Sequence, residues 1–333
     1  MLSTILCLAA LCFSGANALS VCTANSPTFR FEFGKVKGTI VYDGPSFFSS
    51  NPFTVADSLV NDSYNSLFRE SFPFEFSLNV AVFDLPEGRV MIDAGAFNSA
   101  ERLPLIPGTS DAGRLVETLK SSGMHPSSID YVLLTHGHAD HVLGLIDEDG
   151  KRVFRKAEVL ISKEEHMFWF ADSVKLNDSV IPQPIVDQLA RAYSDSVRPY
   201  LKGGKLRLVE ERGCPLPSVR FIPTYGHTPF HNAIELHSEG ERMVVAGDAW
   251  VSRADQLRNV EWGFVIDNEF GRAASSRRAL LEEVAGSRAL ALSYHEQFPG
   301  VGHVTRNADG DFDWVGLNVG NLQRGARTKC DKQ

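Results

Sequence analysis

The sequence predicts an α/β protein in which two layers of β-sheet are covered by helices. Short apolar runs typical of strands alternate with amphipathic helical patterns through both halves of the chain. Several neighbouring runs are joined by short polar turns, as in antiparallel hairpins. The 333 residues contain neither a linker-like change of composition nor an internal repeat, so we predict one domain.

The first residues have the composition of a secretory signal. Residues 5–13 form an apolar run that is too short to span a membrane, and Ala16-Asn17-Ala18 has the small-x-small pattern of a cleavage site. No Lys or Arg precedes the run, which departs from the usual pattern. We predict a signal peptide at residues 1–18, a single domain at residues 19–333, and a secreted protein, either extracellular or periplasmic.

The charge of the chain excludes two classes of partner. A net charge of −8 without a basic stripe argues against nucleic acid and against a polybasic membrane anchor.

Cleavage of the signal peptide would leave three cysteines, Cys22, Cys214 and Cys330. Cys22 and Cys330 lie near the two mature ends, and the sequence leaves open whether a disulfide joins them. Asn61 and Asn177 begin glycosylation sequons, which matter only in a eukaryotic source.

Strands dominate the expected amino-terminal half. Alternation with period two predicts strands at residues 29–33, 36–42, 77–83 and 89–92, whereas residues 43–75 have no clean period and are expected to be irregular. Asp111 is expected to cap a helix at residues 111–122. Asp93 ends a strand before a glycine turn, where it either orients a metal ligand or caps the turn.

Strands and helices continue to alternate in the second half. We expect helices at residues 163–170, 185–201 and 277–285, and another that begins near residue 142. Strands are expected at residues 129–135, 158–162, 205–209, 219–223, 233–237, 242–246, 289–294 and 312–319.

Three histidines and one aspartate occur within six positions, directly after the expected strand at residues 129–135. They are His136, His138, Asp140 and His141. Four side chains that can bind a metal on a single turn are hard to explain by packing. We therefore interpret this cluster as half of a metal site.

Three further candidate ligands follow other expected strands, and each lies beside a glycine. They are His227, Asp248 and His303. Five imidazoles and two carboxylates are the number expected for two metal ions that share one carboxylate. A single structural zinc ion would more naturally use cysteine thiolates. His231 and His295 are candidates to orient a ligand by hydrogen bonding.

The pattern H-x-H-x-D-H on a strand–helix turn, followed by separate His, Asp and His residues, resembles that of the metallo-β-lactamase superfamily. From about Ser77 to Val319 the chain is most similar to the methyl parathion hydrolase group. The similar segments are Leu134-Thr135-His136, Gly226-His227-Thr228-Pro229, the pair Phe168-Trp169, and Phe298-Pro299-Gly300-Val301-Gly302-His303-Val304. Phe230 and Leu143 depart from the family pattern, which has glycine at these positions.

The resemblance implies an αββα sandwich of two mixed sheets flanked by helices. It also implies how the ligands divide between two ions, with Asp248 as the bridge. One ion would be held by His136, His138 and His227, and the other by Asp140, His141 and His303. Zinc is the default ion for such ligands. Phe168, Trp169 and Trp250 are candidates to line a substrate pocket, with a role in the core as the alternative.

These inferences predict a metallohydrolase that attacks its substrate with a metal-bridging hydroxide, with Asp140 and Asp248 as catalytic residues that hold the geometry. By resemblance, the substrate is a small apolar molecule: a lactone, a carboxyl ester or an organophosphate triester. Two alternatives remain. One is thioester or β-lactam hydrolysis at the same centre, and the other is a secreted metal-binding protein without catalysis. A homodimer is left open.

Overall fold

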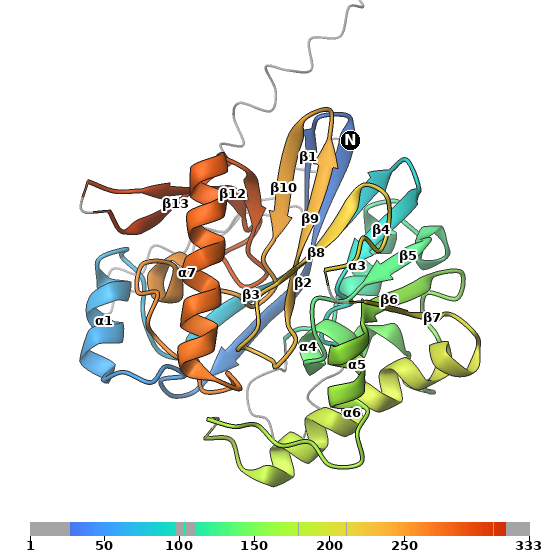
Figure 1. Cartoon of the computed structure of the whole chain (residues 1–333), viewed down its shortest axis with the longest axis horizontal. Coiled ribbons are helices and arrows are strands. Elements are labelled where there is room, and N and C mark those ends of the chain that lie inside the picture. The colour runs from blue at the N-terminus through green and yellow to red at the C-terminus, as the bar shows by residue number, and fades with distance from the viewer. Residues whose placement is uncertain are drawn as a thin grey trace, which may run out of the picture.

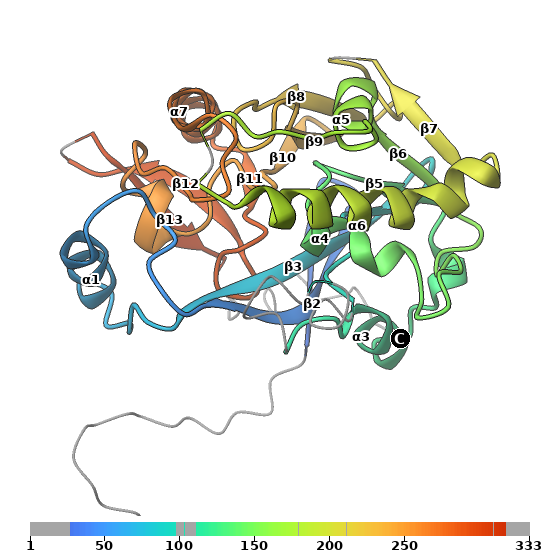
Figure 2. The same ribbon diagram turned by 90° about the horizontal axis from the view of Figure 1, so that it is seen from below.

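Two β-sheets pack face to face in the computed structural model, and helices cover both outer faces (Figure 1; Figure 2). The structure describes residues 27–97, 103, 111–178, 180–210, 212–308 and 310–317. This arrangement is the predicted αββα sandwich of two mixed sheets. The predicted signal peptide, Cys22 and Cys330 lie outside the described residues, and Cys214 is an exposed free thiol.

The first sheet has seven strands, in the order in which they occur along the chain. They are β1 (Thr28–Phe33), β2 (Val36–Phe48), β3 (Phe74–Leu85), β4 (Gly88–Ile92), β5 (Tyr131–Leu133), β6 (Glu158–Ser162) and β7 (Leu206–Val209). The pairs from β1 to β4 are antiparallel, and those from β4 to β7 are parallel. The parallel part is the part connected through helices, as parallel strands require.

The second sheet has six strands in the order β13-β12-β11-β10-β9-β8. They are β8 (Val219–Pro223), β9 (Asn232–Ser238), β10 (Glu241–Val245), β11 (Leu290–Leu292), β12 (Val301–Arg306) and β13 (Phe312–Gly316). Only the pair β10 and β11 is parallel. Both sheets are therefore mixed.

The helices form the two outer layers. The longer ones are α1 (Asp57–Asn65), α6 (Gln183–Lys202) and α7 (Phe270–Ser287). The shorter ones are α3 (Leu115–Ser121), η1 (Pro126–Ser128), α4 (Ala139–Val142), η2 (Leu143–Leu145), α5 (Lys163–Trp169) and η3 (Arg253–Leu257). Contacts place α3, α5 and α6 on the first sheet and α7 on the second. In the described segments, every helix is too short or too polar to cross a membrane.

Three apolar layers hold the sandwich together. The layer between the sheets takes side chains from both of them, such as Phe83 and Leu133 from the first and Phe221 and Leu292 from the second. In β1 the inward side chains alternate with exposed ones, as the period of two predicts. A second layer fills the space between the first sheet and its helices, and a third lies under α7.

The polarity of the strands brings five loops to one edge of the sandwich. β4 and β5 are parallel, and so are β10 and β11. Both β8 and β10 are antiparallel to β9, so they point the same way. The segments that follow these strands carry six of the seven predicted metal ligands, and they meet at this edge of the two sheets.

Three local expectations were wrong. Residues 43–75 are not irregular throughout, because β2 continues to Phe48 and α1 lies within this range. Asp111 does not cap the next helix, which begins at Leu115; the buried Asp43 instead accepts the Leu115 N–H at 2.5 Å. Residues 301–306 form a strand, β12, where a loop was expected.

Close backbone packing beside this edge can be tested at Gly144 in η2. A methyl group there would overlap the carbonyl oxygen of Ala94, which follows β4. Because a backbone oxygen cannot move aside as a side chain can, we expect Gly144→Ala to lower the free energy of unfolding by about 1–3 kcal/mol in urea titration. Gly286→Ala in α7 is the matched control, because its Cβ would meet open space. That variant should be unchanged or more stable by up to about 1 kcal/mol. Equal stabilities for the two variants would contradict this packing argument.

Candidate metal centre

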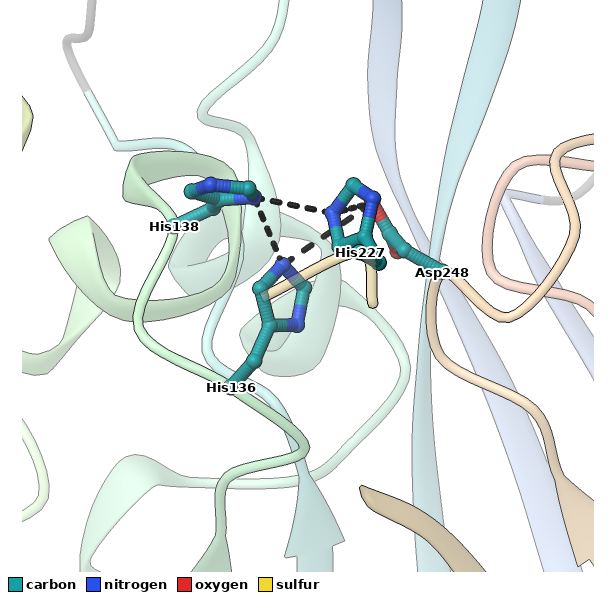
Figure 3. A group of neighbouring side chains, drawn as sticks. All are labelled: His136, His138, His227 and Asp248. Carbon is teal, nitrogen blue, oxygen red and sulfur yellow. Dashed lines mark hydrogen bonds and ion pairs between the residues drawn. The ribbon is translucent and has the colours of Figure 1, made fainter. Parts of the chain in front are cut away.

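Seven histidine and aspartate side chains gather at this edge in two groups. The first group consists of His136, His138, His227 and Asp248, and the second of Asp140, His141 and His295. In each group the potential ligand atoms lie within 4.8 Å of one another. Figure 3 shows the first group, whose three imidazole rings point toward one another with the Asp248 carboxylate beside them.

The ring nitrogens of the first group converge on a common point. His136 Nε2 lies 3.0 Å from His138 Nδ1, and His138 Nδ1 lies 2.9 Å from His227 Nε2. All three rings are buried, so no bulk water separates them. Three imidazole nitrogens that approach each other in this way have the arrangement of ligands around a small cation.

Asp248 stands between the two groups. Its Oδ2 lies 3.2 Å from His227 Nε2 and 3.1 Å from His295 Nε2, while its Oδ1 lies 3.1 Å from His141 Nε2. Asp140 Oδ2 completes the second group at 3.5 Å from His141 Nε2 and 3.6 Å from His295 Nε2. Asp248 thus contacts side chains of both groups, which is the position that a bridging carboxylate would need.

The unpaired atoms at this centre fit a divalent metal. His141 Nε2 and Asp248 Oδ1 are buried and have no hydrogen-bond partner among the described residues, although they face each other. Leaving such atoms unpaired costs about 1–3 kcal/mol each, and a cation between them would satisfy both. With five imidazoles and two carboxylates, the donor set suits zinc and related ions.

Burial and the carboxylates set the charge states. Burial and the neighbouring imidazoles hold the pKa values of His136 and His138 well below the usual range, so both rings are neutral and can offer a lone pair. Burial also disfavours the charged form of His227, but Asp248 and Asp267 outweigh it and raise the pKa of His227 to about 9. Burial would raise the pKa of Asp248, yet the imidazoles of His295 and His141 hold it well below its ordinary value.

Three of the candidate ligand imidazoles are oriented through their other ring nitrogen. Asp93 Oδ2 lies 2.9 Å from His141 Nδ1, and Asp267 Oδ1 lies 2.8 Å from His227 Nδ1. His295 Nδ1 lies 3.0 Å from the carbonyl oxygen of Ser77. Such partners fix the ring orientation of metal ligands. The Asp93 carboxylate contacts a candidate ligand, as the first of its two predicted alternatives requires, and it also accepts hydrogen bonds from the backbone and the hydroxyl of Thr135.

His231 has the orienting role that was considered for it. Its Nδ1 lies 2.7 Å from Thr224 Oγ1, and its Nε2 accepts the backbone N–H of Asp248 at 3.1 Å. Burial and the neighbouring His227 lower the pKa of His231 to about 3, so the ring is neutral. Both nitrogens of the His231 ring are already occupied, and the ring holds Asp248 in place through its backbone N–H.

The structure does not bring His303 to the centre, and its assignment to the second ion was wrong. His303 lies on β12, where its Nδ1 is 3.1 Å from the carbonyl oxygen of Ala289. Because β12 runs antiparallel to β11, each residue after Val301 lies farther from the carboxyl end of β11. His303 therefore lies level with the opposite end of that strand and lines a separate hollow of about 420 Å³.

His295 takes the place that was predicted for His303. It lies three residues beyond the end of β11, the same offset that separates His136 from the end of β5 and Asp248 from the end of β10. In the sequence, His295 directly follows the expected strand at residues 289–294, as His136 directly follows that at residues 129–135, and this shared position could have identified it. His295 was considered only as an orienting residue, because the glycine-rich segment around His303 matched the family pattern more strongly.

Of the three aromatic residues predicted to line a substrate pocket, Trp169 and Trp250 lie in the core and Phe168 is partly buried against it. Trp169 is buried beneath the centre, with its ring 5.2 Å from the ring of His138, and Phe168 packs edge-on against it. Trp250 is buried under α7. The positions of the two tryptophans explain their burial. Trp169 lies on the side of α5 that faces the first sheet, and Trp250 comes two residues after Asp248, where the chain packs against the second sheet.

A different set of residues lines the cavity that opens on the centre. The cavity holds about 310 Å³, and His138, Asp140 and His295 form part of its wall. The rest of its wall is mostly apolar and comes from β2, the start of α6 and the loop before α7. Among these residues are Phe47, Phe48, Phe76, Ile181, Ile185, Leu189, Phe264 and Ile266. No single stretch of sequence contains this set, which explains why the sequence did not reveal it.

The layered fold and the paired His/Asp groups define a class of metal-dependent α/β hydrolases. Residues 74–295 match the family model described as the Metallo-beta-lactamase superfamily, which is more than half of the chain. The protein belongs to this superfamily and is a hydrolase of it.

Two kinds of relative accompany the family match. An N-acyl homoserine lactonase of Bacillus cereus is 22% identical over 228 residues, covering 65% of this chain and 79% of the lactonase. The hydrolase AbOPH of the beta lactamase superfamily is 26% identical, with a TM-score of 0.80 over 89% of this chain and 99% of that one. AidC, a dizinc quorum-quenching lactonase, has the same fold at 23% identity, with a TM-score of 0.77 over 88% of this chain and 99% of AidC.

Substituting the two histidines separately distinguishes the observed centre from the one expected by sequence. We expect His295→Ala to lose about one bound metal ion per chain, because the second group would keep only two ligands. His303→Ala should keep the wild-type metal content. Elemental analysis of the purified variants measures both, and circular dichroism checks that each is folded. Metal loss in His303→Ala with retention in His295→Ala would contradict the arrangement described above.

Proposed function

We propose that the protein is a dinuclear zinc hydrolase of small, neutral, apolar lactones or carboxyl esters. The observation that carries the proposal is the apolar cavity whose wall contains His138, Asp140 and His295. A substrate held there would have its acyl chain against aliphatic and aromatic side chains and its reacting carbonyl beside the centre.

The cavity favours uncharged substrates. Among the described residues of the lining, Asp140 is the only carboxylate, and neither Lys nor Arg occurs there. β-Lactam antibiotics carry a carboxylate, and common biological thioesters carry several negative charges, so both would need a cationic partner. The lining therefore favours lactones and simple esters over this alternative.

The residues of the chain divide the chemical tasks. When bound, two divalent ions would lower the pKa of a water molecule and polarise the carbonyl under attack. Asp248 would hold the two groups in register, because its oxygens face ligands of both. The Asp140 carboxyl is partly exposed, at 24%, and lies in the cavity wall, so its Oδ2 can accept a proton or hydrogen bond from the attacking water. The apolar wall would exclude bulk water from the reacting carbonyl.

Similarity supports the lactone class and one further substrate. The lactonase of Bacillus cereus and AidC both act on lactones according to their names, and they share the fold or the sequence pattern of this chain. Organophosphate triesters are the second candidate, because the Phe298-Pro299-Gly300 segment resembles the methyl parathion hydrolase group. A neutral triester also fits an uncharged cavity, and the same ions could polarise its phosphoryl oxygen.

A substrate series of increasing acyl length tests the proposal. We expect kcat/KM for neutral lactones to rise about fourfold per added methylene until the cavity is filled, because each buried methylene contributes about 0.8 kcal/mol. An analogue with a carboxylate at the chain end should react much more slowly. Steady-state assays of lactone, aryl ester and phosphotriester series measure this preference.

Two controls accompany the series. Chelator treatment should abolish turnover, and added Zn²⁺ should restore it. Asp248→Ala should lose both bound metal and turnover, because both groups depend on this carboxylate. If the wild type binds metal yet hydrolyses none of these substrates, the protein is instead a metal-binding protein without this catalysis.

We also propose that the enzyme is secreted and acts on a small molecule without a nucleic acid partner or membrane anchor. The apolar run at residues 5–13 and Ala16-Asn17-Ala18 support export, and the net charge of −8 argues against anionic polymers. A secreted enzyme would begin at Leu19. Expression of the full chain in a secreting host, followed by mass spectrometry of protein from the medium, should find this terminus. Retention in the cell with Met1 intact would contradict export.

A further inference from the structure

Glu165 is a buried carboxylate directly beneath the first ligand group. It lies in the first turn of α5, where its backbone N–H is 3.2 Å from the hydroxyl of the N-cap residue Ser162. The side chain is completely buried. It was not among the predicted site residues, and its position in a Lys-Glu-Glu segment is typical of an exposed helix start.

The carboxylate of Glu165 ties together the two loops that carry the three histidines. Its Oε1 accepts the backbone N–H of Gly137 at 2.9 Å, and Gly137 lies between His136 and His138. Its Oε2 accepts the hydroxyl of Thr228 at 2.8 Å, and Thr228 follows His227. One side chain therefore contacts the neighbours of all three imidazoles in the first group.

A third hydrogen bond fixes the position of this carboxylate. Trp169 Nε1 donates to Oε1 at 2.6 Å, and the Trp169 ring packs against the ring of His138. Gly137 lies so close to the Trp169 ring that even one added carbon would overlap it. The carboxylate, the indole and the first loop therefore form a single packed unit.

The Glu165 carboxylate forms no close ion pair. Burial raises its pKa, and the charge of His227 acts on it from farther away and lowers the pKa by less. Among the described residues, no side-chain nitrogen of Lys, Arg or His lies within 4.0 Å of the Glu165 carboxylate, the distance that defines an ion pair. The contrast is Glu235, which is equally buried but pairs with Arg220, Arg242 and His237. Burying a carboxylate without a counter-charge costs several kcal/mol. A positive charge close to Glu165 would offset this cost.

We propose that Glu165 is a positioning residue of the metal centre and that its buried negative charge strengthens binding of a divalent cation by His136, His138 and His227. This inference rests on the metal centre of the proposed function. The hydrogen bonds alone do not require a carboxylate, because a glutamine amide could accept from Gly137 and Trp169 and donate to the Thr228 oxygen. Only the negative charge of the carboxylate, which glutamine lacks, would attract the cation.

Glu165→Gln separates the charge from the hydrogen bonds. In the purified full-length protein, we expect its Zn²⁺ affinity at the tighter site to fall about 10–100-fold, the usual effect of altering an outer partner of a metal ligand. Competition with a chromophoric chelator measures this affinity. The metal-free variant should be at least as stable in urea as the metal-free wild type, because it buries no unpaired charge.

Two further variants keep the test decisive. Glu165→Asp retains the charge but shortens the side chain, so it should bind Zn²⁺ more tightly than Glu165→Gln even though its packing is worse. Glu235→Gln is the matched control: it removes a buried carboxylate outside both ligand groups. That variant should lose stability with and without metal while keeping the wild-type Zn²⁺ affinity.

The outcomes distinguish this inference from the proposed function. If the wild type binds no divalent ion, both fail. If the wild type binds Zn²⁺ and Glu165→Gln binds it equally well, only the role of Glu165 fails. Equal loss of stability in the metal-free and metal-loaded forms of Glu165→Gln, with unchanged affinity, would show that Glu165 serves packing alone.

Discussion

The convergence of buried imidazole nitrogens at one sheet edge is the constraint on which the rest of the structure depends. His136, His138 and His227 present ring nitrogens to one another at about hydrogen-bond distance, inside the protein and away from water. Neutral rings in this arrangement direct lone pairs at a common point, and protonated rings would repel one another. A divalent cation between the rings would accept the lone pairs of the neutral rings and would make their protonation unnecessary. The local arrangement is therefore that of a metal-binding site.

Buried carboxylates surround these imidazoles. Asp248 contacts both ligand groups, while Asp93 and Asp267 orient His141 and His227 from behind. Glu165 holds the loops from below. Around one small volume, these carboxylates favour positive charge, as the raised pKa values of His227 and His141 show. A metal ion bound at this centre would therefore stabilise this edge.

The sequence predicted the fold class and six of the seven side chains that the structure brings together. Residues 136–141 were predictable because they are contiguous, and His227 and Asp248 because each follows an apolar strand beside a glycine. His303 was misassigned because the segment after β11 forms a strand rather than a loop, and strand pairing is a long-range property. The same limit hid the cavity, whose wall is assembled from β2, α6 and the loop before α7. It also hid Glu165, whose surroundings exist only once α5 packs beneath the ligands.

The centre and the cavity constrain different aspects of function. Ligand geometry depends on strand ends that the sheets hold rigidly, so the reaction class follows from the fold and the His/Asp pattern. The cavity wall depends on segments that lie outside those strand ends, including Phe47 and Phe48 at the end of β2 and Ile181 and Ile185 near the start of α6. Such segments can change without disturbing a ligand. Under the proposed function, substrate preference would be set mainly by apolar side chains that lie outside the ligand loops. The described wall contains no basic residue, which favours neutral molecules.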